Sequence, residues 1–344
     1  MSTEDNILLI RLKSIGDILF TLPAVHVVRE NFPGARLHFL VSQENAPLLR
    51  GFSEIDAVIP LDRAVYFSKN PKAICGSTFQ LLRRLRQQHF SRAIDLQGYG
   101  ETELLAWWSG APTRWGCVYN RSRGWLYTRG VRRNEKIHPA DWNLSLLEQC
   151  GLHPGKIVNE FVLPEDALNE ARRFFAAHNL KTDKPTLFIQ PFTSSPQKNW
   201  PLENFLELAQ HWQQHGLQVL FGGGPADWSA LEPVRQAGFP ISAGVPLLVT
   251  GGLTRLSTLA LGGDTGVLHL AVALGKRVVM IMESAAPSRP HPYQHADWAL
   301  VPPNDRIISN VKTATVLQAC VRAFNEAGLP LALWSDKSIA KGAR

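Results

Sequence analysis

The chain has 344 residues, of which 45% are hydrophobic and 19% are charged, and its formal net charge of +7 favours an anionic partner. This length and composition predict a folded protein of two domains and exclude an intrinsically disordered chain. Because no apolar run approaches the ~18–20 residues of a membrane-spanning helix, and because the acidic N-terminus lacks a basic leader, we expect a cytoplasmic protein without a membrane span.

The first half of the chain alternates apolar strands with helices. Residues 6–12 and 35–42 predict two strands of a parallel sheet, joined by an amphipathic helix that ends near residue 34. The same alternation continues with predicted strands over 55–61, 92–98 and 113–118 and a predicted helix over 79–88.

The pattern restarts in the second half. Predicted helices cover 166–179, 203–216 and 269–275, and predicted strands cover 186–191, 217–224 and 277–282. We therefore expect an α/β protein with two Rossmann-like, doubly wound domains, residues 1–165 and 166–310, that face a central cleft. A last helix over 311–328 can pack back on the first domain. Ligands of such sheets bind beyond the carboxyl ends of the strands, so functional residues should directly follow strands.

The cysteines do not define a metal site or a disulfide framework. They are widely spaced and form neither a Cys-x-x-Cys motif nor a cluster with histidine: Cys75, Cys117, Cys150 and Cys320. This spacing favours reduced thiols.

The first candidate site is KSIGD, residues 13–17, directly after the first predicted strand. Gly16 permits a close approach by another group, and Asp17 can cap a helix that begins at Ile18. Capping alone explains this carboxylate, but a carboxylate at the mouth of a sheet can also act on a ligand. Both interpretations remain open.

The second candidate site is the loop after the predicted strand 186–191. It contains Lys198 together with the hydroxyls of Thr193, Ser194 and Ser195. A lysine here can reach a phosphate as a mobile point charge, whereas the alternative is a solvated surface lysine. The neighbouring hydroxyls favour an anion site.

The third candidate site is GDTG, residues 263–266, which precedes the helix that contains His269. Asp264, Thr265 and Gly266 introduce a helix whose first N–H groups and dipole suit a phosphate or diphosphate. An ordinary helix cap and a packed histidine are the alternative.

The fourth candidate is GGGPAD, residues 222–227, which follows the apolar part LQVLF of the predicted strand 217–224. Its glycines lack the G-x-G-x-x-G spacing, so they are weak support for nucleotide binding. Asp227 can accept hydrogen bonds from ribose hydroxyls or cap the following helix.

Residues 113–136 mix arginines with aromatic residues. The arginines are Arg114, Arg121, Arg123, Arg129, Arg132 and Arg133. Such a segment can bind an anionic glycan, a lipid headgroup or nucleic acid, and a solvated basic face is the alternative.

Taken together, the motifs resemble those of the lipopolysaccharide heptosyltransferases of glycosyltransferase family nine. The matching stretches are KSIGD, AIDLQG at 93–98, KNWP at 198–201 and GDTGVLHLAVALGK at 263–276, in order over about residues 6–283. The stretch IPLDRAVYFSKN, together with RAIDLQG, is most similar to the heptosyltransferase I branch, which adds the first heptose to the Kdo sugars.

This resemblance implies a GT-B fold and an inverting mechanism that uses no catalytic metal and no cofactor. The implied donor substrate is ADP-L-glycero-D-manno-heptose, and the implied acceptor is an inner-core lipopolysaccharide of the Kdo-lipid A type. The implied location is the cytoplasm, with peripheral contact to the anionic inner face of the inner membrane. Nucleic acid is not an implied partner.

The resemblance also implies roles for single residues. Asp17 would be the base for the acceptor hydroxyl, which needs only one carboxylate when inversion occurs by direct displacement. The implied donor-binding residues are Thr193, Ser194, Lys198, Asp227, Asp264, Thr265, Gly266 and His269. The implied acceptor-binding residues are Lys13, Ser14, Gly16, Arg63, Arg121 and Arg123.

Two stretches depart from the family pattern. Residues 251–262 are shorter than the helix and strand expected there, and Met282-Glu283-Ser284 replaces a Phe-Gly loop. These departures favour an alternative, a non-catalytic or donor-altered homologue that binds a nucleotide sugar or an anionic glycan. A nucleotide-dependent oxidoreductase is a third interpretation, which the missing G-x-G-x-x-G disfavours.

Overall fold

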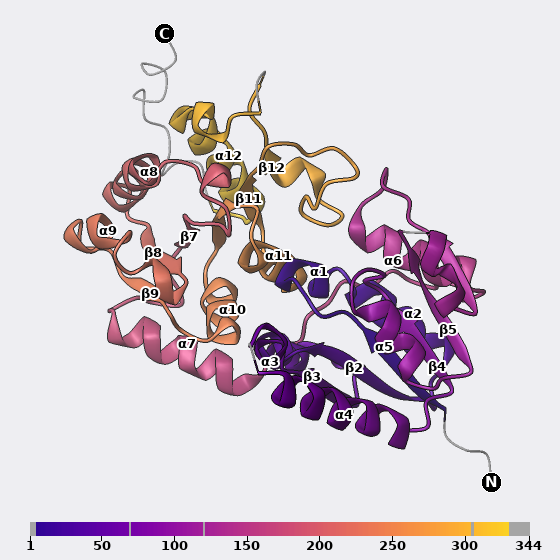
Figure 1. The fold of residues 1–344 in the computed structure, drawn as a ribbon. Coiled ribbons are helices and arrows are strands. Elements are labelled where there is room, and N and C mark those ends of the chain that lie inside the picture. The colour runs from indigo at the N-terminus through magenta and orange to yellow at the C-terminus, as the bar shows by residue number, and fades with distance from the viewer. Residues whose placement is uncertain (1–4, 69, 120, 304–305, 330–344) are drawn as a thin grey trace. The chain divides into compact units, whose positions relative to one another are not determined.

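The computed structural model describes residues 5–68, 70–119, 121–303 and 306–329, without the side chains of Phe67 and residues 121–123. The chain divides into two compact units, Met1–Val162 and Leu163–Arg344. Unit 1 is drawn in indigo and magenta and unit 2 in pink to yellow (Figure 1). Each unit is described by itself.

Unit 1 is built on a parallel sheet. In the described part of the chain this sheet has six strands in the order β3-β2-β1-β4-β5-β6. The strands are β1 Asn6–Ile10, β2 Arg36–Ser42, β3 Ala57–Leu61, β4 Arg92–Asp95, β5 Thr113–Val118 and β6 Arg129–Arg132. Central strand β1 pairs Ile7 with Leu37 on one side and with Arg92 on the other.

The helices of unit 1 cover this sheet. They are α1 Ile15–Leu19, α2 Leu22–Asn31, α3 Ala64–Phe67, α4 Pro71–Gln87, α5 Thr102–Trp108 and α6 Pro139–Gln149, with 3-10 helices Gln43–Gly51 and Arg121–Leu126. Helices α4 and α5 bury Leu81, Leu85 and Leu105 in one cluster with Leu8 and Ile10 of β1. Helix α2 packs against α6.

The single helix predicted after β1 is two helices, α1 and α2. Pro23 explains the break, because a proline is accommodated in the first turn of a helix but disrupts the interior. The chain therefore starts a new helix at Leu22, with Pro23 in its first turn.

Unit 2 repeats the architecture of unit 1. Its described strands form a parallel sheet in the order β12-β11-β10-β7-β8-β9. They are β7 Thr186–Gln190, β8 Gln218–Gly223, β9 Ile241–Ala243, β10 Leu259–Gly263, β11 Val278–Ile281 and β12 Ala299–Leu300.

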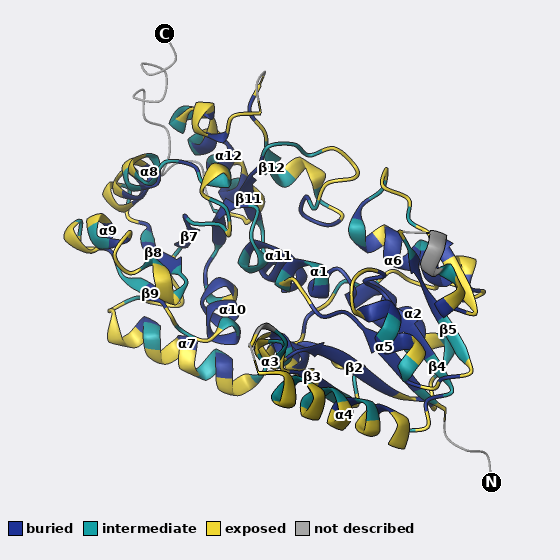
Figure 2. Cartoon of the chain, viewed as in Figure 1, coloured by how far each residue is buried: buried dark blue, intermediate teal, exposed yellow. Residues whose placement is uncertain are grey.

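Helices cover both faces of the second sheet. They are α7 Glu165–Ala177, α8 Leu202–Gln214, α9 Glu232–Gln236, α10 Leu247–Leu256, α11 Gly266–Ala273 and α12 Thr313–Glu326, with 3-10 helices Pro196–Lys198, Pro225–Asp227, Ala296–Trp298 and Ile308–Asn310. One buried cluster joins the sheet to α8, α9 and α12, and another joins it to α7, α10 and α11. Figure 2 shows the strands buried and the outer faces of the helices exposed.

The C-terminal helix α12 packs within unit 2. Helix α12 packs on β10, β11 and α8 of unit 2, where Phe324 lies edge-on to Trp212 with ring centroids 5.3 Å apart. Its apolar face is thereby buried in the core of unit 2.

Residues 251–262, which are shorter than the expected family pattern, form parts of a helix and a strand. Both elements are present, as the end of α10 and the start of β10. The sequence pattern did not predict this helix, because the glycines at 251 and 252 have a low helix propensity. Gly252 allows α10 to pack tightly on α7, since a Cβ added there would lie 2.7 Å from the Cβ of Ala171.

Both sheets have the strand order of a doubly wound fold, which confirms the expected α/β class with two Rossmann-like domains. In such a sheet the order reverses at a switch point, and ligands bind beyond the carboxyl ends of the two strands that flank it. The switch point lies between β1 and β4 in unit 1 and between β7 and β10 in unit 2. Among the described helices, none is both long and apolar enough to cross a bilayer.

Candidate active site

Asp17 lies at the switch point of unit 1, beyond the carboxyl end of β1. Helix α1 begins at Ile15 and not at Ile18, so Asp17 occupies the first turn and Ser14 precedes the helix. The backbone N–H and the hydroxyl of Ser14 donate to Oδ2 of Asp17 at 3.2 and 3.0 Å. The carboxylate therefore does close the start of the helix, but this uses only one of its two oxygens.

The other oxygen of Asp17 faces Arg11, a residue to which the sequence analysis assigned no role. Nη2 of Arg11 lies 2.8 Å from Oδ1 of Asp17. The remaining guanidinium nitrogens are also engaged, because Nη1 donates to the carbonyl of Leu96 at 2.9 Å and Nε donates to that of Lys13 at 3.0 Å. Arg11 is buried, so the cation is fixed in place.

This arrangement keeps Asp17 ionised. Burial of the carboxyl opposes ionisation, but the charge of Arg11 and the hydrogen bonds from Ser14 and Arg11 outweigh it and hold the pKa of Asp17 below its ordinary value. The side chain of Asp17 is 34% exposed to solvent. A charged, partly accessible carboxylate can accept a proton from a ligand.

The neighbouring loop follows β4 and is held by a buried carboxylate. Asp95 accepts hydrogen bonds from the N–H groups of Gln97 and Gly98, both at 2.9 Å, and from the hydroxyl of Tyr127 at 2.7 Å. Burial raises the pKa of Asp95. Gly98 has φ +74°, and a Cβ there would lie 2.3 Å from the carbonyl oxygen of Cys117, so only glycine fits.

The two loops are joined at the switch point. Besides the bond from Arg11 to Leu96, the amide oxygen of Gln97 accepts from the N–H of Leu12 at 3.1 Å. Asp95 thus fixes the loop that fixes Arg11, and Arg11 fixes Asp17. The AIDLQG motif therefore has a structural role, which is to hold the loops after β1 and β4 together.

The other predicted acceptor residues of unit 1 divide into three groups. Lys13 and Ser14 are exposed beside Asp17, and Gly16 is buried inside α1. Arg63 lies beyond β3, where its Nε donates to Oε1 of Glu101 at 3.2 Å. The side chains predicted at positions 121 and 123 lie outside the described residues.

Unit 2 carries its own cluster at its switch point, made of Lys198, Asp264 and His269. Nζ of Lys198 lies 3.1 Å from Oδ2 of Asp264, and Nε2 of His269 lies 3.1 Å from Oδ1 of the same carboxylate. Burial opposes the ionisation of Asp264, but His269 and Lys198 outweigh it and lower its pKa. Asp264 therefore orients both partners.

The hydroxyls near this cluster serve the backbone. The Thr193 hydroxyl donates to the carbonyl of Ser195 at 2.8 Å and accepts from its N–H, which shapes the loop before Lys198. Thr265 caps α11 by accepting from the N–H of Leu268 at 3.3 Å. Gly266 opens α11, whereas Ser194 is exposed.

Asp227 follows β8 and acts as a local cap. Its Oδ2 accepts from the N–H of Gly224 at 2.7 Å. This contact favours the capping interpretation of Asp227 over ribose binding.

A small cavity of about 80 Å³ adjoins the cluster of unit 2. Lys198 and Asp264 line it together with Glu283 and Arg289. It is smaller than the ~300–1,000 Å³ of a whole ligand pocket, so it suits one group of a larger ligand. Glu283 brings negative charge here, and Arg289 adds a cation that no sequence motif indicated. Within the described part of both units, no three His, Cys, Asp or Glu side chains gather as a metal site would require.

Comparisons with known proteins agree with this architecture. The model of the family described as glycosyltransferase family 9 (heptosyltransferase) matches residues 78–316. The lipopolysaccharide core heptosyltransferase OpsX of Haemophilus influenzae is 24% identical over 300 residues, 84% of this chain and 82% of that protein.

Two solved structures share the fold. The E. coli ADP-heptose lipopolysaccharide heptosyltransferase II has a TM-score of 0.79 at 19% identity, over 94% of this chain and 100% of that chain. The E. coli heptosyltransferase WaaC with ADP has a TM-score of 0.74 at 18% identity, over 92% and 99% of the two chains.

Proposed function

The chain belongs to glycosyltransferase family 9, the heptosyltransferases, and from this premise we propose its donor, its acceptor and its chemistry. The donor is ADP-L-glycero-D-manno-heptose and the acceptor is an inner-core lipopolysaccharide of the Kdo-lipid A type. The names of the relatives support both choices, since one is an ADP-heptose lipopolysaccharide heptosyltransferase and another acts on the lipopolysaccharide core. Membership of a transferase family sets the oxidoreductase interpretation aside.

The observation that carries the proposal is the ion pair between Arg11 and Asp17 at the switch point of unit 1. In the proposed reaction the acceptor hydroxyl oxygen attacks the anomeric carbon of the heptose while the bond from that carbon to the β-phosphate oxygen breaks. The hydroxyl proton passes to Asp17, ADP leaves with the bonding electrons, and the anomeric configuration inverts. Lys13 and Ser14 are exposed beside Asp17 and are proposed contacts of the acceptor.

The donor diphosphate is assigned to unit 2. Negative charge accumulates on the β-phosphate as ADP leaves, and a fixed cation and a helix N-terminus stabilise such charge. Lys198, which Asp264 orients, and the start of α11 at Gly266 supply these two elements. Arg289 lines the same cavity and is a second proposed cation. No metal or cofactor is required for this scheme.

Peripheral contact with an anionic membrane is proposed for the segment 113–136. Trp115 and Tyr127 are buried in this segment and belong to the core, whereas Trp125 is 68% exposed and Arg129 and Arg132 are exposed. Exposed aromatic and basic side chains together favour the interface of an anionic bilayer. The contact places the enzyme on the cytoplasmic face of the inner membrane, beside its lipid-linked acceptor.

The test is to incubate the protein with ADP-heptose and Kdo-bearing lipid A and to follow ADP release. We expect Asp17→Asn to lower kcat by roughly 10²- to 10⁴-fold, the usual contribution of a positioned base, while the Kd of ADP-heptose stays unchanged. Full turnover by this variant would contradict the assignment of Asp17.

Glu283 supports a second candidate, a transferase with a different donor. Its carboxylate lines the cavity with Lys198, where it opposes a diphosphate. Thermal stabilisation by another nucleotide sugar, with turnover of that sugar but not of ADP-heptose, would favour this candidate.

A further inference from the structure

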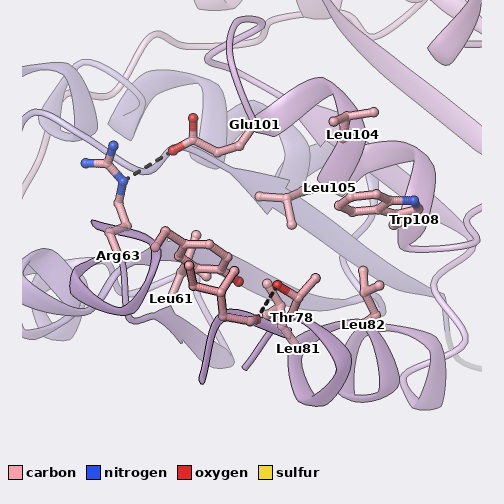
Figure 3. A pocket seen from close by; sticks show the side chains of 11 residues that line it. Leu61, Arg63, Thr78, Leu81, Leu82, Glu101, Leu104, Leu105 and Trp108 are labelled. Carbon is pink, nitrogen blue, oxygen red and sulfur yellow. Dashed lines mark hydrogen bonds and ion pairs between the residues drawn. The ribbon is translucent and has the colours of Figure 1, made fainter. Parts of the chain in front are cut away.

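Unit 1 contains a second pocket, of about 430 Å³, between helices α4 and α5 (Figure 3). Leu61 at the end of β3 contributes to its wall. Its other apolar walls include Tyr66, Ile74, Leu81, Leu82, Leu105 and Trp108. The volume falls within the ~300–1,000 Å³ of small-molecule sites. Neither Asp17 nor Arg11 lines it.

The charged groups of the pocket, Arg63 and Glu101, lie at one end. Figure 3 shows Arg63 and Glu101 paired there, with Nε of Arg63 3.2 Å from Oε1 of Glu101. Within the wall, the hydroxyl of Thr78 donates to the carbonyl of Ile74 at 2.7 Å and so serves its own helix. The rest of the lining is leucine, isoleucine and aromatic side chains.

Such walls are unsuited to water and costly to leave empty. A water molecule needs two to four polar partners, which an aliphatic and aromatic wall does not provide. Apolar surface of this extent that stays in contact with water is also unfavourable, and a hydrocarbon group that covers it gains free energy. The chemistry of the pocket therefore fits a hydrocarbon group.

Helix α4, which forms one wall, presents a basic outer surface. Its sequence contains no acidic residue, and Lys72, Arg83 and Arg84 are exposed on it. Phe79, next to the lining residue Thr78, is 67% exposed. Cations together with an exposed aromatic side chain are typical of a helix that meets anionic lipid headgroups. The charge of α4 thus complements a hydrocarbon chain that carries an anionic head.

We propose that this pocket binds a fatty acyl chain of the lipid-linked acceptor, an inference that rests on the proposed function. The pocket lies in the same unit as Asp17, to which the acceptor is assigned, and the basic surface of α4 complements the anionic acceptor. Chain binding strengthens the attachment of the acceptor and leaves the chemical step unchanged.

The test compares two acceptors, Kdo-bearing lipid A with its acyl chains and the same molecule after removal of the chains, both below their aggregation concentrations. We expect the acylated acceptor to bind the wild-type protein at least about tenfold more tightly, a difference that burial of two methylene groups suffices to give. Leu82→Trp and Leu104→Trp fill the pocket from α4 and α5 and should abolish this difference. Gln80→Trp, on the exposed side of α4, is the matched control and should keep it.

A second readout separates this inference from the proposed function. Binding of the fluorescent fatty acid 11-(dansylamino)undecanoic acid is measured directly, with lauric acid as the competitor, and needs no turnover. Saturable binding to the wild type and to Gln80→Trp, lost in both filled variants, supports the pocket.

Equal affinity for the two acceptors overturns the inference, even if transfer to both proceeds and the proposed function stands. Fatty-acid binding combined with equal acceptor affinity also overturns it, because the pocket then serves another lipid. Absence of ADP release with tight binding of only the acylated acceptor contradicts the proposed function and supports the pocket. Thermal unfolding of each variant verifies that it is folded.

Discussion

The guanidinium of Arg11 lies 2.8 Å from the carboxylate of Asp17, and the same guanidinium binds the carbonyl of Leu96 in the loop after β4. One buried cation thus joins the two strands that flank the switch point and fixes the candidate base between them. In unit 2, Asp264 has the converse role, because one carboxylate there holds Lys198 and His269.

Replacement of Arg11 by Gln should shift the pH dependence of activity. The Arg11 charge contributes to holding the pKa of Asp17 below 3.8, so in the wild type Asp17 stays ionised throughout the neutral and mildly acidic range. Its removal should raise the pKa of Asp17, because an opposite charge that favours the ionised form is lost. The acid limb of kcat/KM should then move to higher pH.

The lowered pKa of Asp17 also contributes to the stability of the folded protein. A depressed folded-state pKa contributes stability that is present above the unfolded value and is lost as the pH falls through the folded value. Arg11→Gln should remove this contribution. Arg36→Gln, at the exposed amino end of β2, is the control and should leave the pH profile of kcat/KM in place; an unshifted acid limb in Arg11→Gln would mean that Asp17 is not the titrating base.

Lys198→Met should weaken donor binding. Loss of one hydrogen bond to a charged phosphate costs about 1.5–3 kcal/mol, so the Kd of ADP should rise roughly 10- to 100-fold in isothermal titration. Lys184→Met removes an exposed lysine at the opposite, amino end of β7 and serves as the matched control. If both variants bind ADP equally well, the diphosphate lies elsewhere.

Much of the fold and part of the site were predictable from the sequence. The apolar strands and the helices between them gave the correct α/β class, and residues that directly follow strands were the right place to look for polar clusters. Lys198 and Asp264 are far apart in the chain, yet both were predicted from their positions after strands, and the structure brings them together. His269 was predicted from its place in the helix after Asp264, and it contacts the same carboxylate.

Other features depend on neighbours that a single sequence does not reveal. Arg11 directly follows β1, but its partner Leu96 becomes visible only when the order of β1 and β4 is known. Arg289 belongs to no regular element and follows no periodic pattern. Gly251 and Gly252 oppose helix formation locally, and tertiary packing on α7 overrides that preference.

Glu283→Gln should strengthen donor binding if the donor is ADP-heptose. The carboxylate shares its cavity with Lys198 and Asp264, and removal of a partly solvated like charge is worth up to about 1 kcal/mol. We expect the Kd of ADP to fall about two- to fivefold, whereas Glu203→Gln at the exposed start of α8 should not change it. Weaker ADP binding in Glu283→Gln would show that this carboxylate serves the donor, and would favour the candidate with a different nucleotide sugar.

Tyr127→Phe should destabilise unit 1. Its hydroxyl donates to the fully buried carboxyl of Asp95 at 2.7 Å, and no solvent is available to replace it. Loss of this bond leaves a buried oxygen without its donor, which costs about 1–3 kcal/mol in the free energy of unfolding, and urea denaturation at neutral pH would measure this change. A double-mutant cycle with Asp95→Asn isolates the pair, since the two changes should be strongly non-additive. Additive effects would mean that Tyr127 stabilises the unit by packing alone, and that the loop which holds Arg11 does not depend on this bond.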